Sequence, residues 1–416
     1  MHAIEKLLAA AAKKESVRTG EIVECDVDVA GINDLYLQAV KSFYEMGGTR
    51  VKKAESVVVF LDHYAPASTV AQAENQKAFR DFCAEQGIAN LMDINAGVCH
   101  QILADKGFSK PGKLIVVTDS HTTTHGAFGA FGTGVGATDM AIILLTGRLW
   151  FKVPEIIKIE LTGAPKKGVS AKDVILHIIG SLKADYAIYK AVEFAGEYVS
   201  SLSVSERMAL CNMTTEMGAK TAYIQPDATT IDFLNENGEN DYRVFETDEG
   251  YEYAERLRFD VAEISPTVAA PSSVDNVFAL SRYAGTPVDQ AYLGSCTGGR
   301  VEDIRIAASI LEGKRIAKNT RFLLVPASQK VLLEAMEKGY IQTLVKAGAT
   351  LVTPGCASCL GTHEGIIASG ETCISSTNRN FPGRMGHREG AIFLASPAAV
   401  AASALNGCIT DPSEYV

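Results

Sequence analysis

The sequence predicts an α/β protein of two or three domains, and three observations lead to this prediction. Short apolar runs have the length of buried strands, and they alternate along the chain with longer stretches of helical periodicity. The 416 residues exceed what one ordinary hydrophobic core requires. Polar residues follow directly after the apolar runs, and binding sites in α/β layers lie at such strand ends.

The first half of the chain contains helices, whose apolar residues recur at three- and four-residue spacing, and strands, which alternate or are apolar throughout. The predicted elements are, in order, a helix at 1–14, a strand at 21–29, a helix at 34–46, a strand at 57–61, a helix capped by Ser68, a strand at 114–117, a helix at 138–149, a strand at 156–161 and a helix at 171–182. Ser170 and Asp173 have the spacing of a capping box, which supports the start of the last helix.

The second half begins with a stretch that carries few apolar runs. Residues 235–253 are acidic and rich in turn residues, so we expect them at the surface, and prolines 266 and 271 predict a long loop or linker. Beyond it the predicted elements are a strand at 291–293, a helix at 301–311, a strand at 322–325, a helix at 328–347, a buried strand at 351–352, strands at 372–374 and 391–394, and a helix capped by Ser396. Together with the turn at 163–168, these joints predict domains at 1–162, 163–284 and 285–416.

Composition limits the classes of function. Hydrophobic residues make up 47% and charged residues 21% of the chain, which is typical of a soluble globular protein. The net charge of −10 disfavours a nucleic-acid binder, because contacts to phosphates need a basic surface. No stretch approaches 18 uncharged apolar residues, so we expect no membrane span. Nine cysteines without an export signal predict reduced thiols and a cytoplasmic location.

Three cysteines lie in loops that follow predicted strands. Cys356 and Cys359 are separated by two residues in a loop rich in glycine and proline, and Cys296 lies 60 residues upstream of Cys356 in a similar loop. Three thiolates predict a metal or cluster site with one open position. A closed structural zinc site would need a fourth, distant ligand, whereas a four-iron cluster with three thiolates would keep one iron open to substrate.

Two other interpretations of these thiols stay open. A thioredoxin-like redox pair is disfavoured, because Cys356 does not open a helix in the usual βαβ pattern. The thiols could instead be inert and buried, as we expect of Cys25, Cys83, Cys211 and Cys408.

Two predicted strands end on a carboxylate close to a histidine, in Asp62-His63 and in Asp119-Ser120-His121. A carboxylate fixes the tautomer of an imidazole and raises its basicity, which suits a proton donor to a leaving hydroxyl. For each histidine, the alternative is a structural role with satisfied hydrogen bonds.

His100 and Glu216 form a further candidate acid–base pair. His121 and His125 have the spacing of metal ligands on a helix, but no glutamate follows His121 as in the zinc-protease motif, so we reject that interpretation.

Two arginines, Arg379 and Arg384, lie five residues apart in a predicted loop. A guanidinium suits two-point recognition of a carboxylate, so this loop is a candidate anion-binding segment; a pair of surface arginines is the alternative. The glycines at 129–136 do not have the Gly-x-Gly-x-x-Gly spacing, and we expect no dinucleotide site there.

Five motifs together resemble those of the aconitase superfamily, in its isopropylmalate dehydratase and homoaconitase group. The motifs are Val117-Thr118-Asp119-Ser120-His121-Thr122, the glycine-rich run at 126–134, Gly294-Ser295-Cys296-Thr297, Pro354-Gly355-Cys356-x-x-Cys359, and the run from Thr377 to Arg384. The resemblance extends over nearly the whole chain. It implies three α/β/α domains around a cluster cleft, without the swivelling domain that other members of the superfamily carry.

The resemblance also implies the site. It implies a [4Fe–4S] cluster with three cysteine ligands and one open iron, on Cys296, Cys356 and Cys359. It implies acid–base roles for Asp62, His63, His100, Asp119, His121 and Glu216. It implies substrate or cluster contacts for Ser120, Asn212, Asn378, Arg379 and Arg384.

The resemblance further implies a partner and a substrate class. The catalytic serine base of the superfamily sits on the swivelling domain, so a small subunit is expected to supply it, and the chain alone should not be competent. The expected substrate is a 2-hydroxy di- or tricarboxylate, with 3-isopropylmalate of leucine biosynthesis first and homoaconitate or 2,3-dimethylmalate as alternatives. Gly298 stands where the family usually has asparagine, and Thr362 where a basic residue is common.

Functions of two other classes are less compatible with the sequence. An apo-form regulator that binds RNA is disfavoured by the acidic net charge. A zinc-dependent hydrolase would require a single metal ion on the thiols.

Overall fold

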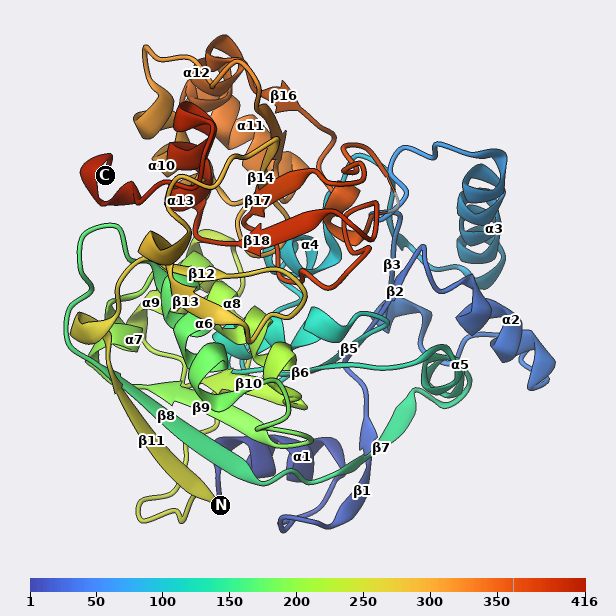
Figure 1. The fold of residues 1–416 in the computed structure, drawn as a ribbon. Coiled ribbons are helices and arrows are strands. Elements are labelled where there is room, and N and C mark those ends of the chain that lie inside the picture. Colours follow the sequence, from blue (N-terminus) through green and yellow to red (C-terminus); the bar gives the residue numbers. More distant parts are fainter. Residues whose placement is uncertain (362) are drawn as a thin grey trace.

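A computed structural model describes residues 1–361 and 363–416, so the departure from the family pattern at Thr362 lies outside the described residues. The strands form three large sheets and a two-stranded ribbon, and each large sheet is the centre of one body of the molecule (Figure 1). In Figure 1 the first body is blue and teal, the second is green to yellow, and the third runs from yellow through orange to red. The predicted α/β class is confirmed.

The first sheet has five strands in the order β4-β3-β2-β5-β6, all parallel. Its strands are β2 (Val29–Asn33), β3 (Val57–Phe60), β4 (Asn90–Met92), β5 (Leu114–Val117) and β6 (Phe131–Gly134). The helices of this part are α1 (Ala3–Ala11), α2 (Leu37–Glu45), α3 (Val70–Gln86), α4 (Cys99–Asp105) and α5 (Ala137–Thr146). The antiparallel ribbon joins β1 (Ile22–Asp26) to β7 (Arg148–Lys152).

The second sheet has four parallel strands in the order β10-β9-β8-β11. Its strands are β8 (Ile156–Thr162), β9 (Ala191–Ala195), β10 (Thr221–Ile224) and β11 (Glu255–Asp260). Its helices are α6 (Ala171–Leu182), α7 (Glu197–Ser201), α8 (Val204–Met213) and α9 (Ala228–Glu236), and the short 3-10 helix η3 (Thr214–Met217) follows α8.

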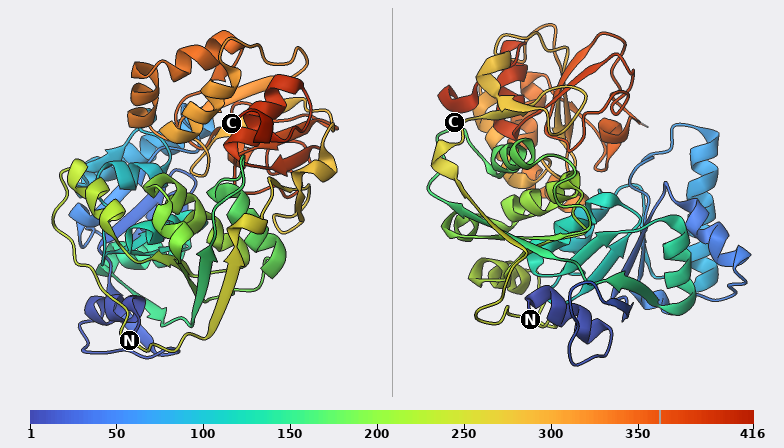
Figure 2. Two further views of the ribbon diagram at one scale, coloured as in Figure 1. Left: turned by 90° about the vertical axis from the view of Figure 1, so that its left-hand side faces the viewer. Right: turned by 60° about the horizontal axis from the view of Figure 1, so that its bottom comes forward.

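The third sheet has seven strands in the order β13-β12-β18-β17-β14-β15-β16, and all run in one direction except β12, which is antiparallel to both of its neighbours. Its strands are β12 (Thr267–Ala269), β13 (Val277–Ala279), β14 (Gln290–Gly294), β15 (Arg321–Val325), β16 (Thr350–Leu351), β17 (Thr372–Ser375) and β18 (Ala391–Leu394). Its helices are α10 (Val301–Leu311), α11 (Gln329–Glu337), α12 (Tyr340–Ala347) and α13 (Pro397–Asn406). Figure 2 shows the same three bodies from two further sides, with the C-terminus on the third.

Several local predictions are confirmed. The helix predicted at 171–182 has these bounds and the Ser170–Asp173 capping box, and the helix at 301–311 and the strand at 391–394 also have the predicted bounds. Ser396 is at the N-cap position of α13, which has a proline in its first turn, but its hydroxyl makes no capping hydrogen bond. These elements carry their own start and stop signals, and so they could be placed from local sequence alone.

Other boundaries differ. Thr69, not Ser68, caps α3, and its hydroxyl accepts a hydrogen bond from the Gln72 amide. The helix predicted at 328–347 is two helices, because Gly339 at the junction has a φ of 77°. The apolar periodicity continues across that junction, and therefore the break was not visible in the pattern.

In place of the buried strand predicted at 351–352, the structure has β16 at 350–351, a short strand at the edge of the third sheet with both of its residues exposed. Val352, directly after β16, is buried as predicted. The sheets also divide the chain earlier than the predicted domains do. β8 precedes residue 163 but pairs in the second sheet, and β12 and β13 precede residue 285 but pair in the third. Strand pairing is a long-range property, so turn residues alone did not place these joints. Within the described parts of the chain, no helix has the length and apolarity that crossing a membrane would take.

A buried contact between a histidine and a carboxylate anchors the N-terminus to the second sheet. His2 caps α1, and its Nε2 lies 2.6 Å from a carboxylate oxygen of Glu193 on β9, which also accepts a hydrogen bond of 2.8 Å from the Tyr253 hydroxyl. Burial raises the pKa of Glu193, but the contacts with His2 and Tyr253 outweigh it, and the pKa is lowered.

We expect Glu193→Gln to lower the free energy of unfolding by about 1–3 kcal/mol at pH 7, because a buried pair loses its charged acceptor. The folded-state pKa of Glu193 lies below its unfolded value, so its contribution is present above the unfolded pKa and is lost as the pH falls through the folded pKa. Denaturant unfolding of both proteins at a series of pH values should therefore show a gap at pH 7 that narrows toward acid. A gap that does not change with pH would contradict this.

Candidate active site

The three large sheets contribute loops to one cavity of about 280 Å³. Its lining includes every predicted site residue except Asp62, Glu216 and Asn212. Each of these three lies directly behind a lining residue and is hydrogen-bonded to it, as described below. Carboxyl ends of parallel strands meet at one edge of a sheet, and the three bodies place three such edges together.

The first group follows β3. Asp62 lies 2.7 Å from His63 Nδ1 through one carboxylate oxygen, and its other oxygen accepts a hydrogen bond of 2.8 Å from the amide of Cys99. Asp34, directly after β2, accepts hydrogen bonds of 3.0 Å from the amides of His63 and Tyr64. The His63 ring thus lies between two carboxylates, since its Nδ1 is also 3.6 Å from Asp34.

Burial opposes protonation of His63, but Asp62 and Asp34 outweigh it and raise its pKa well above the ordinary value. The imidazole therefore holds a proton at neutral pH. Asp34 was not among the predicted site residues, although it follows a strand of the same sheet as Asp62 does. The strand predicted at 21–29 ended too early to reveal it, because β1 and β2 are separate strands and β2 extends to Asn33.

The second group follows β5. Asp119 accepts contacts of 2.9 Å from His100 Nε2 and 2.8 Å from the amide of His121, and His121 Nε2 lies 2.8 Å from Glu216. The predicted pairing of His100 with Glu216 is wrong, because packing of the second body against the first places Glu216 on His121. His63 Nε2 is 3.8 Å from Asp119, which joins the two groups.

These contacts keep the acids of the second group ionised. Burial raises the pKa of Asp119, but hydrogen bonds from His100 and His121 hold that pKa well below its usual value. Burial likewise opposes ionisation of Glu216, and His121 and Arg379 lower its pKa.

The two predicted anion-binding arginines have different surroundings. Arg379 donates through Nε to Glu216 at 2.8 Å and through Nη2 to the Ser120 hydroxyl at 2.9 Å. Arg384 is buried against the thiols, with Nη2 3.7 Å from Cys359 Sγ, and its Nε is buried without a hydrogen-bond partner among the described residues. Arg384 lines the cavity, so its guanidinium is placed to bind an anion there.

The third sheet supplies the thiols. Cys296 follows β14, and Cys356 and Cys359 lie in the loop after β16. The amide of Cys356 donates to the carbonyl of Asp62 at 2.9 Å, which holds this loop against the first body. All three thiols are buried and free.

Side-chain amides and a hydroxyl surround these sulfur atoms. Asn212 Nδ2 lies 3.1 Å and Asn378 Nδ2 3.5 Å from Cys296 Sγ, and the Ser295 hydroxyl is 3.6 Å from the sulfurs of Cys296 and Cys359. A hydrogen bond from Cys356 lowers the pKa of Cys359, and Arg384 adds to this effect. The bond to Cys359 and burial raise the pKa of Cys356, and burial raises the pKa of Cys296 to about 11. Donors of this kind stabilise thiolates, which are the form that binds metals.

The spacing of the thiols indicates what they could hold. Among the described residues, the only three His, Cys, Asp or Glu ligand atoms that lie within 4.8 Å of one another belong to Asp34, Asp62 and His63. A zinc–sulfur bond is about 2.3 Å, so two sulfurs on one zinc ion are at most about 4.6 Å apart. The three thiols therefore do not have the spacing of ligands to one zinc ion.

Gly298 is explained by packing. A Cβ at this position would lie 2.4 Å from Cβ and Oγ of Ser376, whose hydroxyl accepts a hydrogen bond of 3.0 Å from the amide of Gly294. A side chain at residue 298 would displace Ser376 from the cluster loop. The amides near the thiols come from Asn212 and Asn378 instead.

Comparison with known proteins agrees with this geometry. The sequence matches the aconitase family (aconitate hydratase) over residues 5–286 and 280–407. A probable methanogen homoaconitase large subunit of Methanothermobacter thermautotrophicus is 46% identical over 100% of this chain and 98% of its own length. The 3-isopropylmalate dehydratase large subunit 1 of Methanopyrus kandleri is also 46% identical, over 99% of each chain.

A solved structure, aconitase X of Thermococcus kodakaraensis in its holo-form, superimposes with a TM-score of 0.54 at 11% identity, covering 91% of this chain and 90% of that one. At this identity the likeness shows the fold alone. Taken together, the family match along the chain and the full-length relatives show that the chain belongs to the aconitase family of hydro-lyases.

Proposed function

We propose that the chain is the large subunit of a [4Fe–4S] hydro-lyase that removes water from, and returns it to, a 2-hydroxy di- or tricarboxylate. The observation that carries this proposal is the single cavity that combines three thiols, an acid–base network and two guanidiniums. A hydroxy-polycarboxylate needs each of these partners: a Lewis acid, a proton donor and carboxylate binders.

Cys296, Cys356 and Cys359 would hold the cluster, with Asn212, Asn378 and Ser295 in hydrogen-bond contact with the sulfurs. When bound, such a cluster supplies a Lewis acid that polarises the hydroxyl and the adjacent carboxylate of the substrate. Aconitase-family hydro-lyases generally use this cofactor. The free thiols also support our placement of the protein in the cytoplasm, where thiols remain reduced.

His63 would protonate the departing hydroxyl. Its raised pKa keeps a proton on the imidazole at neutral pH, and Asp62 fixes the ring through Nδ1, so Nε2 faces the cavity. His100, Asp119, His121 and Glu216 form the surrounding network, which holds two carboxylates ionised close to that proton.

Arg379, Arg384 and Ser120 would bind the substrate carboxylates. The buried guanidinium of Arg384 is the deeper donor, beside Cys359, and the more exposed Arg379 is the outer one. Glu216 holds Arg379 in place, so its guanidinium is oriented before the substrate arrives.

The base that takes the α-proton would come from a small subunit with the swivelling domain and the catalytic serine. The relatives are named large subunits, which supports a two-chain enzyme. We place 3-isopropylmalate first as the substrate, with homoaconitate and 2,3-dimethylmalate as alternatives. Relatives named for the first two are equally similar to this chain, at 46% identity.

The test is anaerobic reconstitution of the chain with iron, sulfide and the candidate small subunit, followed by assays with isopropylmalate, homocitrate, citrate and dimethylmalate. We expect dehydration of one or more of these acids, fastest with isopropylmalate, and none by the chain without its partner. A complex with a full cluster that is inactive on all four would overturn the proposed function. Activity of the single chain would overturn the assignment of the base to the partner.

A further inference from the structure

A buried lysine lies behind the thiols, outside the cavity that the proposed reaction uses. Lys172 stands in the first turn of α6, and its side chain is almost fully buried. No ion pair among the described residues involves it. Instead, its ammonium donates to the carbonyls of Thr377 at 2.6 Å and Ser376 at 3.2 Å, and lies 3.6 Å from Met213 Sδ.

This placement is costly. Removing an ammonium from water without a carboxylate partner costs several kcal/mol, so a hydrophobic residue would be the cheaper choice for stability alone. Burial lowers the pKa of Lys172 to about 8, although the nearby Cys296 and Cys359 favour its charge. Because burial of the Lys172 ammonium lowers stability, we expect the charge to have a local structural role.

The two carbonyls belong to the residues directly before Asn378 and Arg379. Asn378 contacts Cys296 Sγ, and Arg379 contacts Glu216 and Ser120. An ammonium that binds two successive carbonyls fixes both peptide planes, and the second of these planes ends at the nitrogen of Asn378. The direction in which Asn378 leaves the backbone therefore depends on Lys172.

The loop that carries Cys296 contacts one of the same two carbonyls. The Thr297 hydroxyl donates to the carbonyl of Ser376 at 2.8 Å, so this carbonyl accepts from both Lys172 and the residue after Cys296. A second buried cation, Arg300, donates to the carbonyl of Cys296 and to Gln101 Oε1. Both cations thus bind the backbone of the loops that carry the thiols and Asn378.

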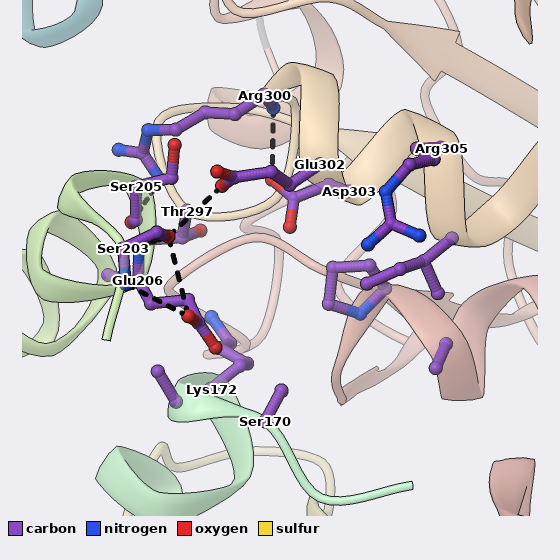
Figure 3. Close-up of a pocket in the computed structure, with 15 residues that line it drawn as sticks. Ser170, Lys172, Ser203, Ser205, Glu206, Thr297, Arg300, Glu302, Asp303 and Arg305 are labelled. Carbon is purple, nitrogen blue, oxygen red and sulfur yellow. Dashed lines mark hydrogen bonds between the residues drawn. The ribbon is translucent and has the colours of Figure 1, made fainter. Parts of the chain in front are cut away.

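Figure 3 shows this back wall, in which Lys172 of α6 and two residues of the loop between β14 and α10, Thr297 and Arg300, border a cavity of about 240 Å³. Carboxylates also border it, but two of them serve helix starts: Glu206 accepts from Ser203 at the start of α8, and Asp303 from the amide of Arg300 at the start of α10. Neither of these two carboxylates pairs with Lys172, whose oxygen acceptors are the carbonyls of Ser376 and Thr377.

We propose that Lys172 is a positioning residue, which fixes the loop of Asn378 and Arg379 against the three thiols. The expected effect of Lys172 on catalysis rests on the proposed function, in which Arg379 binds a carboxylate of the substrate. Its structural consequence, the order of residues 376–380, does not depend on any substrate.

The test compares Lys172→Met, which keeps length and removes the charge, with Lys172→Arg, which keeps the charge and donors. Arg207→Met is the matched control: Arg207 is fully buried on α8 but pairs with Asp227, away from the thiols. For each chain, hydrogen–deuterium exchange of a peptide spanning 375–384 and iron and sulfide content after reconstitution are measured. With the small subunit, KM and kcat are measured separately.

We expect Lys172→Met to speed exchange of the 376–380 amides at least tenfold, to lower cluster content and to raise KM tenfold or more. In Lys172→Arg, amide exchange, cluster content and KM should be close to the wild-type values. Arg207→Met should lower the unfolding temperature without these local changes. Unchanged exchange and cluster content in Lys172→Met would overturn the proposal, as would equal effects of Arg207→Met on the same amides. If Lys172→Met fails to fold, wild-type values in Lys172→Arg support the proposal, and faster 376–380 exchange in that folded variant would contradict it. The exchange and content measurements need no turnover, so an inactive wild-type complex would overturn the proposed function while leaving this inference to be decided.

Discussion

Replacing Cys359 by serine is expected to prevent stable cluster assembly and to reduce dehydratase activity of the reconstituted complex by at least about a thousandfold. Lewis-acid stabilisation contributes several kcal/mol, and each 1.36 kcal/mol corresponds to a tenfold change in rate. Cys359 is the thiol whose pKa is lowered, by Cys356 and by Arg384, so it is the sulfur best prepared to bind as thiolate. A serine hydroxyl at the same position stays protonated at neutral pH.

Cys408→Ser is the matched control, since Cys408 is a partly exposed free thiol in the loop after α13. Iron and sulfide analysis, the electron paramagnetic resonance spectrum and the dehydration rate should match the wild type in the control and be lost together in Cys359→Ser. Full activity with an intact cluster in Cys359→Ser would show that the thiols do not hold the cofactor as proposed.

Replacing His63 by glutamine is expected to lower kcat by about 10²–10⁴-fold, the usual contribution of a positioned general acid, with KM changed only a few-fold. The carboxylates of Asp62 and Asp34 hold a proton on His63, and the ring lines the cavity. Glutamine can still occupy the space between the two carboxylates, but it cannot transfer a proton. Because the pKa of His63 is raised, the wild type keeps its acid at neutral pH, and the loss should extend across the neutral range.

His177→Gln is the control for this substitution. His177 lies on α6 and packs edge-on against Phe259, away from the cavity lining. Cluster content should be equal in His63→Gln, His177→Gln and the wild type, so a change in kcat can be assigned to proton transfer. A kcat within threefold of the wild type in His63→Gln, with a full cluster, would exclude His63 as the acid.

The strand ends of this chain could be read from local sequence. Apolar runs of strand length placed Asp62-His63 after β3 and Asp119 after β5, and parallel strands necessarily present such residues at one edge of their sheet. The thiols followed from the same rule. The helix α6 was placed by its capping box, which satisfies the first amides of a helix wherever the helix lies.

The partners of these residues could not be read in this way. Glu216 lies in η3, and it meets His121 across 95 residues of chain and Arg379 across 163. Asp34 joins His63 only because β2 and β3 are neighbours in the sheet.

Local patterns determined the α/β class, the strand-end acids and the three thiols, because these depend on periodicity and on residues close in sequence. The packing of three bodies decided which acid meets which histidine and why Lys172 is buried. Those contacts join segments that are distant along the chain, and side chains find them only when the sheets have come together.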